Sequence, residues 1–262
     1  MKILSPDLDI ESFFSQVAKA RERLLLLDYD GTLAPFHVKR DQALPYPGVV
    51  ELLNDIRYSQ ASRVVIISGR AIQDLTPLLD INPLPEIWGS HGWEHLSDNG
   101  EYVIASPDEP TKQALSLAKE CIESLDLMQY CEQKPVSIAL HWRGLATSVA
   151  ASIESQVKNR WKDLEDISNL KVKDFDGGME MRIEGKNKGT AVNSIIENLG
   201  KEVLIAYLGD DKTDEDAFKA LNKRGLSVLV REEFRLTDAD LWIKPPEELI
   251  EFLSKWKQAC LR

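Results

Sequence analysis

The sequence lacks an excess of positive charge. Its 262 residues include 32 Lys and Arg against 43 Asp and Glu, which gives a formal net charge of −11. Because nucleic acids and anionic membranes are bound by basic surfaces, we expect neither as a partner. An anionic substrate would have to be held by local positive charge from a metal ion, a lysine or a helix N-terminus.

Cysteine and long apolar segments are also scarce. The chain has three cysteines, an odd number without a CxxC pair, so no disulfide framework is indicated. No apolar run approaches membrane-spanning length. Residues 1–22 are acidic and contain no signal-peptide core. We therefore expect a soluble cytoplasmic protein without a membrane partner, with a monomer as its expected state.

What the sequence does contain is an alternation of apolar strands and amphipathic helices. Strands are predicted at Leu24–Leu27, Arg63–Ile67, Glu86–Gly89, Val203–Leu208, Leu226–Val230 and Leu241–Ile243. Helices are predicted at Pro6–Arg21, Gly48–Arg57, Ala71–Leu79, Gly189–Leu199, Thr213–Leu221 and from Pro246 onward. This order predicts an α/β fold with a doubly wound parallel sheet.

The pattern changes in the middle of the chain. After a predicted hairpin at Trp93–Ile104, the order becomes helix, two strands, helix and two strands. Such an order is typical of a separate α+β layer. We expect a core formed by residues 1–105 and 178–262, with an α+β domain inserted at 106–177.

Polar residues follow three of the core strands at the point where each strand ends. They are Asp28 and Asp30 after the first strand, Ser68 after the second, and Asp210 and Asp211 after the fourth. In open α/β sheets ligands bind at this edge, so we expect these side chains to converge. Lys188 directly precedes a predicted helix. Acids, a hydroxyl and a lysine together suit a phosphoryl group and Mg²⁺.

Other kinds of site fit these residues less well. An EF-hand loop with Gly31 at its sixth position starts at Leu26 and places His37 where a glutamate is needed. A P-loop nucleotide site needs a Gly-x-x-x-x-Gly-Lys-Ser/Thr motif, which the sequence lacks. The four histidines are few and scattered, so we do not expect a transition-metal site.

Ordinary structural roles stay open for several residues. Thr213 can cap a helix, and Glu215 and Asp216 suit the dipole of its first turn. Lys186 competes with Lys188 for the position at the helix N-terminus. These alternatives concern single residues and leave the predicted phosphoryl and metal site as a whole in place.

The motifs occur in the order of a known superfamily. The stretch Asp28-Tyr29-Asp30-Gly31-Thr32-Leu33 resembles the first motif of the haloacid-dehalogenase-like (HAD) phosphatases. Ser68 and Lys188 resemble the second and third motifs, and the stretch 209–214 resembles the fourth. The resemblance covers essentially the whole chain. It implies a Rossmann-like HAD core with an inserted cap domain that determines substrate specificity.

Within this superfamily the sequence is most similar to the trehalose-6-phosphate phosphatase family. The similar stretches are Ser68-Gly69-Arg70, Gly89-Ser90-His91-Gly92-Trp93-Glu94, Glu132-Gln133-Lys134, Ser137 to Arg143, and Asp210 to Phe218. The resemblance implies Mg²⁺-dependent hydrolysis of a sugar phosphate through an aspartyl-phosphate, with trehalose 6-phosphate as the favoured substrate. Ile183 stands where the family usually has proline after Glu-x-Arg.

The resemblance also implies roles for single residues. Asp28 would attack phosphorus, Asp30 would act as acid and then base, and Ser68 and Lys188 would hold the phosphoryl oxygens. The metal residues would be Asp28, Asp30 through its carbonyl, and Asp210, with Asp211 and Asp214 binding metal waters or orienting Lys188. The implied substrate residues are Arg70, His91, Glu132, Lys134, His141, Arg143 and Glu180.

Three alternatives remain at this stage. The first is the same chemistry on glucosylglycerol, mannosylglycerate or sucrose phosphate, because the residues of the chemistry do not distinguish these substrates. The second is a phosphotransferase or mutase. The third is a non-catalytic module that binds a sugar phosphate.

Overall fold

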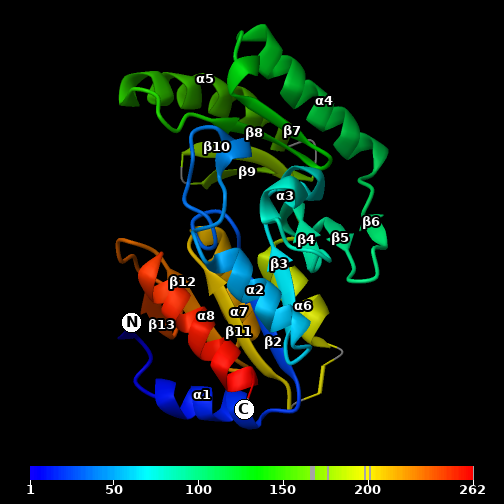
Figure 1. The fold of residues 1–262 in the computed structure, drawn as a ribbon. Helices are drawn as coiled ribbons and strands as arrows, with labels where there is room; N and C mark the ends of the chain where they lie inside the picture. Colours follow the sequence, from blue (N-terminus) through cyan, green and yellow to red (C-terminus); the bar gives the residue numbers. More distant parts are fainter. Residues whose placement is uncertain (166–168, 176, 198, 201, 262) are drawn as a thin grey trace. The chain divides into compact units, whose positions relative to one another are not determined.

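The computed structural model describes residues 1–165, 169–175, 177–197, 199–200 and 202–261. The chain forms two compact units, the first from Met1–Val103 and Asn187–Arg262 and the second from Ile104–Lys186 (Figure 1). The chain returns to the first unit later than the predicted residue 178. The reason is that strand β10 (Gly178–Ile183) pairs with strands of the second unit on both sides.

The first unit contains a nine-stranded sheet with the order β1-β13-β12-β11-β2-β3-β4-β5-β6. Its strands are β1 (Lys2–Ile3), β2 (Arg23–Leu27), β3 (Arg63–Ile67), β4 (Glu86–Gly89), β5 (Glu94–Leu96), β6 (Tyr102–Ile104), β11 (Leu204–Gly209), β12 (Leu226–Val230) and β13 (Leu241–Ile243). The strands from β13 to β4 are parallel, whereas β1 and β5 are antiparallel to their neighbours. The predicted α/β class with a mainly parallel sheet is confirmed.

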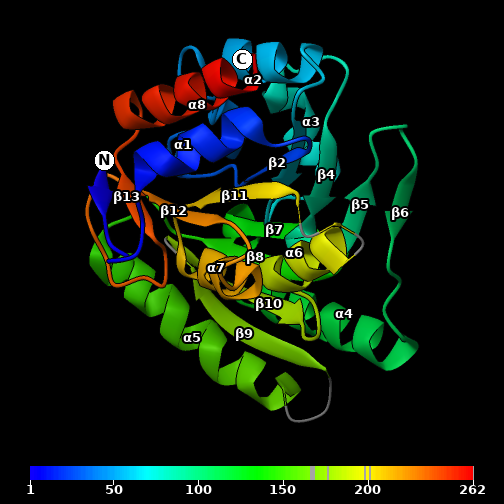
Figure 2. The ribbon, with the colours of Figure 1, turned by 90° about the horizontal axis from the view of Figure 1, so that it is seen from below.

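Helices cover both faces of this sheet (Figure 2). They are α1 (Ile10–Lys19), α2 (Val49–Tyr58), α3 (Ile72–Leu79) and α8 (Glu247–Cys260) on one face, and α6 (Lys188–Glu197) and α7 (Glu215–Leu221) on the other. In β2, Leu25 and Leu27 pack in the hydrophobic core on the face covered by α1, α2, α3 and α8. Leu24 and Leu26 pack in the core on the face covered by α6 and α7. Successive side chains of a strand point to opposite faces, so a strand between two helical layers is apolar throughout.

The first helix is shorter than predicted. It begins after Asp9, whose Oδ1 accepts hydrogen bonds from the N–H groups of Glu11 and Ser12, both at 3.0 Å. This side-chain cap fixes the start of α1 beyond the predicted Pro6. At the other end, Ala20 is already extended. Among the described residues, no helix combines the length and apolar character needed to cross a membrane.

The second unit is a four-stranded antiparallel sheet with two helices. Its elements are α4 (Glu109–Ser124), β7 (Cys131–Lys134), β8 (Ser137–His141), α5 (Thr147–Glu165), β9 (Leu170–Phe175) and β10, with the strand order β7-β8-β10-β9. Buried residues of the sheet, such as Leu140 and Met179, lie on the face that α4 and α5 cover. Trp161 of α5 is fully buried and donates from Nε1 to the carbonyl of Ala118 in α4 at 3.2 Å. The opposite face carries polar side chains.

Candidate active site

Lys188 lies at the start of α6, between two carboxylates. Its Nζ donates hydrogen bonds to Asp28 Oδ1 at 2.6 Å and to Asp214 Oδ1 at 2.8 Å. The three side chains are 4%, 4% and 0% exposed, respectively. A buried charge is tolerated only with partners, so both carboxylates depend on Lys188 and Lys188 depends on them. The structure thus joins residues that are far apart in the sequence.

Asp28 directly follows β2. Its N–H donates to the carbonyl of Leu208 at 2.9 Å, which continues the pairing of β2 with β11 beyond the strand end. Thr32 Oγ1 donates to Asp28 Oδ2 at 3.2 Å. Gly31 has φ of +83°, and a Cβ at this position would lie 2.2 Å from Asp210 Oδ2. Only glycine satisfies both the conformation and the close approach.

Asp214 folds back onto the end of β11. Its Oδ2 accepts hydrogen bonds from the N–H groups of Asp210 at 3.2 Å and Asp211 at 3.0 Å. Its Oδ1 accepts a hydrogen bond from the buried Tyr207 hydroxyl at 2.5 Å. Gly209 permits this arrangement, because a Cβ there would lie 2.4 Å from Asp214 Cγ. With the bond from Lys188, both oxygens of Asp214 are engaged.

The segment after β11 begins differently from the prediction. A 3₁₀ turn, η4 (Lys212–Asp214), precedes α7. Asp211 caps this turn, with Oδ1 accepting from the Lys212 N–H at 2.7 Å, and forms a capping box with Asp214. The cap is therefore Asp211, not Thr213, because the turn starts one residue earlier than the predicted helix.

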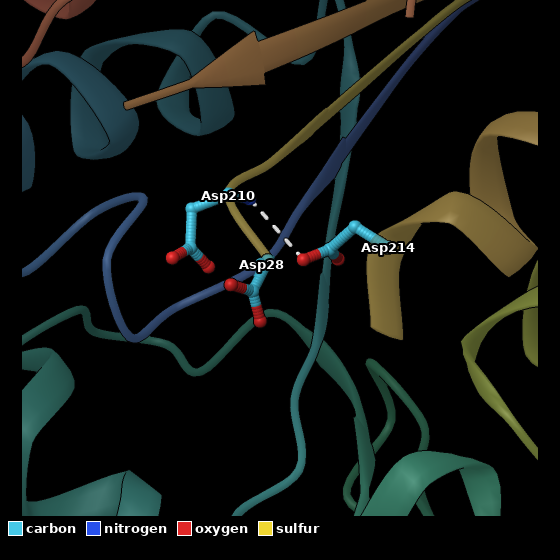
Figure 3. Close-up of side chains that lie close together, drawn as sticks. All are labelled: Asp28, Asp210 and Asp214. Atoms are coloured by element: carbon cyan, nitrogen blue, oxygen red, sulfur yellow. Dashed lines mark hydrogen bonds between the residues drawn. The ribbon is translucent and has the colours of Figure 1, made fainter. Parts of the chain in front are cut away.

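Three of the carboxylates form a group that could hold a metal ion. One oxygen each of Asp28, Asp210 and Asp214 lies within 4.8 Å of the others, and Figure 3 shows the three side chains close together. We call these three residues the acidic cluster. Asp30, predicted at the metal through its backbone carbonyl, and Asp211, predicted to bind metal waters or to orient Lys188, contribute no carboxylate to this group.

The acidic cluster fits a hard divalent cation. Asp210 Oδ2 is buried and accepts no hydrogen bond from the described residues. Arg231 Nη1 lies 3.6 Å from it. Both oxygens of Asp28 and both oxygens of Asp214 already accept hydrogen bonds, whereas Asp210 Oδ2 accepts none from the described residues and is the best-suited ligand oxygen of the three. Mg²⁺ in proteins is usually bound through one or two carboxylates together with substrate oxygens.

Burial and mutual repulsion change the acidity of these groups. Burial raises the pKa of Asp28 to about 7, with Lys188 opposing and Asp214 adding to the increase. Burial, followed by the charge of Asp28, also raises the pKa of Asp210 well above its usual value. Burial alone would lower the pKa of Lys188, but Asp214 and Asp28 raise it. A cation bound here would favour the ionised carboxylates.

Asp30 is held by Arg70. The guanidinium donates from Nε to Asp30 Oδ2 at 2.7 Å and from Nη2 to Oδ1 at 2.6 Å. Its Nη1 donates to the carbonyl of Arg40 at 2.9 Å, and its Cζ lies 5.6 Å from the ring centroid of Tyr29. Arg70, predicted to contact substrate, thus lies in a bidentate ion pair with the predicted acid and base.

Ser68 and His91 meet at the ends of β3 and β4. Ser68 is buried, its Oγ accepts from the Arg70 N–H at 3.1 Å, and its carbonyl accepts from the His91 N–H at 3.0 Å. Ser90, His91 and Gly92 have φ of 46°, 57° and 97°. This left-handed turn places the His91 ring where a Cβ on Gly69 would lie 2.7 Å from its Cε1.

The remaining predicted substrate residues belong to the second unit. Glu180 Oε1 accepts from Lys134 Nζ at 2.8 Å and from Ser137 Oγ at 2.6 Å. Glu132 Oε2 lies 2.9 Å from His141 Nε2 and 3.7 Å from Lys134 Nζ. These five residues form what we call the polar face of the second sheet. The predicted Arg143 follows β8, with its Nε 3.0 Å from where a Cβ on Gly177 would lie.

Comparison with known sequences assigns the family. The model of the trehalose-phosphatase family matches residues 26–238. The chain belongs to the trehalose-phosphatase family. Trehalose-phosphate phosphatase B of Arabidopsis thaliana is 28% identical over 264 residues, covering 92% of this chain and 68% of that protein. The bifunctional trehalose-6-phosphate synthase/phosphatase of Thermoproteus tenax is 28% identical over 225 residues, covering 86% of this chain and 30% of that protein.

Solved structures agree on the HAD fold of this trehalose-phosphatase. The C-terminal domain of C. albicans trehalose-6-phosphate phosphatase has a TM-score of 0.81 and 23% identity, over 98% of this chain and 99% of that one. A phosphatase of the HAD superfamily from Bacteroides thetaiotaomicron has a TM-score of 0.60 and 18% identity, over 97% and 99% of the chains. With the family assignment, the protein is a phosphatase that acts on a phosphoric monoester.

The structure also shows residues of this phosphatase that the sequence did not single out. Tyr207 holds Asp214, Ser137 holds Glu180, and Arg235 contacts the backbone after β11. In the sequence, Tyr207 is one of several apolar residues of a buried strand, and Ser137 is the first residue of another strand. Neither position indicates a functional contact. Nothing in the sequence around Arg235 indicates its contact.

Proposed function

We propose that this trehalose-phosphatase hydrolyses trehalose 6-phosphate to trehalose and phosphate with the help of Mg²⁺. The observation that carries the proposal is the contact of Lys188 with Asp28 and Asp214, beside Asp210, at the carboxyl end of the central strands. A family that acts on a sugar phosphate needs a nucleophile, positive charge for the phosphoryl group and a cation site, and these residues supply all three.

In the proposed reaction Asp28 is the nucleophile. An oxygen of Asp28 bonds to phosphorus while the bond from phosphorus to the sugar oxygen breaks, and Asp30 gives its proton to that oxygen. Asp30 then takes a proton from a water molecule, whose oxygen attacks the phosphorus of the aspartyl-phosphate. Phosphate leaves and the carboxylate of Asp28 is restored.

Mg²⁺ would be held by Asp28, Asp210 and the backbone carbonyl of Asp30. When bound, it offsets the negative charge of the phosphoryl group and of the acidic cluster. Lys188 gives two of its three N–H groups to carboxylates, so one is left to donate to a phosphoryl oxygen. Ser68 would donate to another.

Arg70 fixes the position of Asp30. Both carboxylate oxygens accept hydrogen bonds from the guanidinium, so the carboxyl group is held in one orientation at the end of β2. We propose that Arg70 orients Asp30 rather than contacting the sugar.

The second unit would bind the sugar. The polar face presents Glu132 and Lys134 on β7 and Glu180 on β10, the two strands that flank β8, and such groups suit the hydroxyls of a disaccharide. We propose that Ile104–Lys186 is the cap that selects the substrate and excludes water. His141 and Arg143 would complete this surface, and His91 of the first unit is proposed to contact the substrate.

Phosphate release from a panel of monoesters tests this function. The panel contains trehalose 6-phosphate, glucose 6-phosphate, sucrose 6-phosphate and glucosylglycerol phosphate, each with Mg²⁺ and with EDTA. We expect preference for trehalose 6-phosphate, with activity lost in EDTA and in Asp28→Asn. Metal-dependent turnover of another member would overturn the substrate assignment, and phosphate transfer to an added sugar without release would overturn hydrolysis.

A further inference from the structure

Two side chains of opposite charge hold the backbone of Asp210 and Asp211. On the amide side, Asp214 Oδ2 accepts from both N–H groups. On the carbonyl side, Arg235 donates from Nε to the carbonyl of Asp210 at 3.1 Å and from Nη2 to the carbonyl of Asp211 at 2.8 Å. All four backbone hydrogen-bonding groups of this pair are therefore engaged by side chains, beyond the last paired residue of β11.

Arg235 is itself firmly placed. Its Nη1 donates to a carboxylate oxygen of Glu215 and to the carbonyl of Leu236, the latter at 2.9 Å. Glu215 Oε2 accepts from the Asp238 N–H at 2.8 Å, which fastens the segment after β12 to the start of α7. The Arg235 and Glu215 side chains are 18% and 16% exposed. The planar guanidinium has five donors in a fixed geometry, so one side chain can hold three carbonyls and a carboxylate at once.

The carboxylate of Asp210 depends on this backbone. Its Oδ2 accepts no hydrogen bond from the described residues and has an ion pair with Arg231 Nη1 at 3.6 Å, so the main chain that carries it contributes to the position of that oxygen. Gly31 leaves no space on one side, since Oδ2 lies 2.2 Å from where its Cβ would be. A movement of the Asp210 carbonyl would therefore shift this oxygen relative to Asp28.

We propose that Arg235 is a positioning residue of the divalent-cation site. It fixes the Asp210–Asp211 backbone from the side opposite Asp214, and thereby keeps the Asp210 carboxylate next to that of Asp28. The inference rests on the proposed function for the cation, but it assigns a role to a residue outside the acidic cluster.

Calorimetric titration of the metal-free protein with Mg²⁺, without substrate, tests this role. Loss of groups that orient a metal ligand typically weakens metal binding by about 10- to 100-fold. We expect a Kd for Mg²⁺ raised by roughly 10-fold or more in Arg235→Gln. The single ammonium of Arg235→Lys cannot hold two carbonyls in the same way, so this variant should also bind Mg²⁺ more weakly than the wild type. Wild-type affinity for Mg²⁺ in Arg235→Lys would overturn the proposed role of the planar guanidinium.

Arg224→Gln is the matched control. Arg224 also donates to two carbonyls, those of Ile196 at 3.4 Å and Gly200 at 3.0 Å, but it contacts no residue of the acidic cluster through them. Its Kd for Mg²⁺ should equal that of the wild type. Melting temperatures in EDTA separate the two effects, since a merely structural role of Arg235 would lower this temperature and leave the Kd unchanged. That result would overturn the inference.

Two further variants keep the test decisive. Glu215→Gln keeps Arg235 but weakens the contact that holds its guanidinium. The Kd for Mg²⁺ should therefore rise, by a smaller factor than in Arg235→Gln. This variant gives a result even if Arg235→Gln does not fold. Asp210→Asn should abolish binding. If the wild type binds Mg²⁺ through Asp210 and neither Arg235→Gln nor Glu215→Gln changes the Kd, the inference fails and the proposed function stands. If the wild type binds no Mg²⁺, both fail.

Discussion

The acidic cluster of the first unit and the polar face of the second unit balance charge in different ways. In the acidic cluster three buried carboxylates share Lys188, and the pKa of Asp28 is raised to about 7. On the polar face Glu180 accepts from both Lys134 and Ser137, so its charge is met by direct donors. Three buried carboxylates gathered within a few ångströms of one another suit a cation, whereas alternating donors and acceptors spread over one face of a sheet suit a neutral, hydroxyl-rich ligand.

The two regions should therefore respond differently to mutation. Changes in the acidic cluster should reduce turnover of every phosphate monoester. Changes in the polar face should reduce turnover of the sugar phosphate alone. A small aryl phosphate, p-nitrophenyl phosphate, distinguishes the two, because it carries the phosphoryl group without the sugar.

The largest effect is expected for Asp28→Asn. Loss of the nucleophile should lower kcat by roughly 10⁴-fold or more for both substrates. Steady-state phosphate release measures this loss. Asp174→Asn is the matched control, because Asp174 is an exposed partner of Lys158 in the second unit and should be dispensable. Retained turnover in Asp28→Asn would refute the assignment of the nucleophile.

Lys188→Met should have the next largest effect. It removes the donor to the phosphoryl group, so kcat should fall by roughly 10²- to 10³-fold for both substrates. It also leaves Asp28 and Asp214 without their buried partner, so the free energy of unfolding in urea should fall by about 3 kcal/mol. Lys219→Met, which removes an exposed pair with Asp238, should change this free energy by about 0.5 kcal/mol at most. Equal losses of unfolding free energy in Lys188→Met and Lys219→Met would contradict the central role of Lys188.

Glu180→Gln should affect the sugar alone. The amide removes the negative charge to which Lys134 and Ser137 donate hydrogen bonds, and so disturbs the polar face. We therefore expect kcat/KM for trehalose 6-phosphate to fall about 10- to 100-fold. The value for p-nitrophenyl phosphate should stay unchanged. Glu154→Gln, on the exposed surface of α5, is the control. A parallel loss for both substrates would place Glu180 in the chemistry or in folding, not in sugar binding.

The last prediction concerns how stability changes with pH in EDTA. The pKa of Asp28 is raised from 3.8 to about 7 in the folded protein, so between these values the folded state binds more protons than the unfolded state. The contribution of Asp28 to stability should therefore fall as pH rises from about 4 to about 7. Urea unfolding of the wild type and Asp28→Asn at several pH values measures it. A difference between the two proteins that does not change with pH would contradict the raised pKa.

The sequence predicts the architecture and part of the site for a physical reason. Parallel strands end at one edge, so the residues after β2, β3 and β11 can be expected to meet there, and Asp28, Ser68 and Asp210 do follow these strand ends. The four apolar residues Leu24–Leu27 likewise predict a strand covered on both faces. These inferences need only local patterns and the geometry of a parallel sheet.

Other features depend on contacts that no local pattern encodes. Arg70 reaches Asp30 because of how the turn after β3 is folded, and Arg235 reaches Asp210 from the segment after β12. The insertion ends later than the sequence predicts because β10 has the apolar alternation of any strand, and only its pairing with β8 and β9 assigns it to the second sheet. Side-chain partners of this kind are set by tertiary structure.

Trapping a phosphoryl group on Asp28 tests the proposed chemistry most directly. Asp30→Asn should still be phosphorylated by p-nitrophenyl phosphate, whose leaving group needs little protonation, but it lacks the base for the second step. Borohydride reduction after quenching converts an aspartyl-phosphate to homoserine, which peptide mass spectrometry locates. We predict homoserine at position 28, dependent on substrate and absent in the Asp28→Asn, Asp30→Asn double variant. Release of nitrophenol without modification of Asp28, or with modification of another residue, would contradict the proposed mechanism.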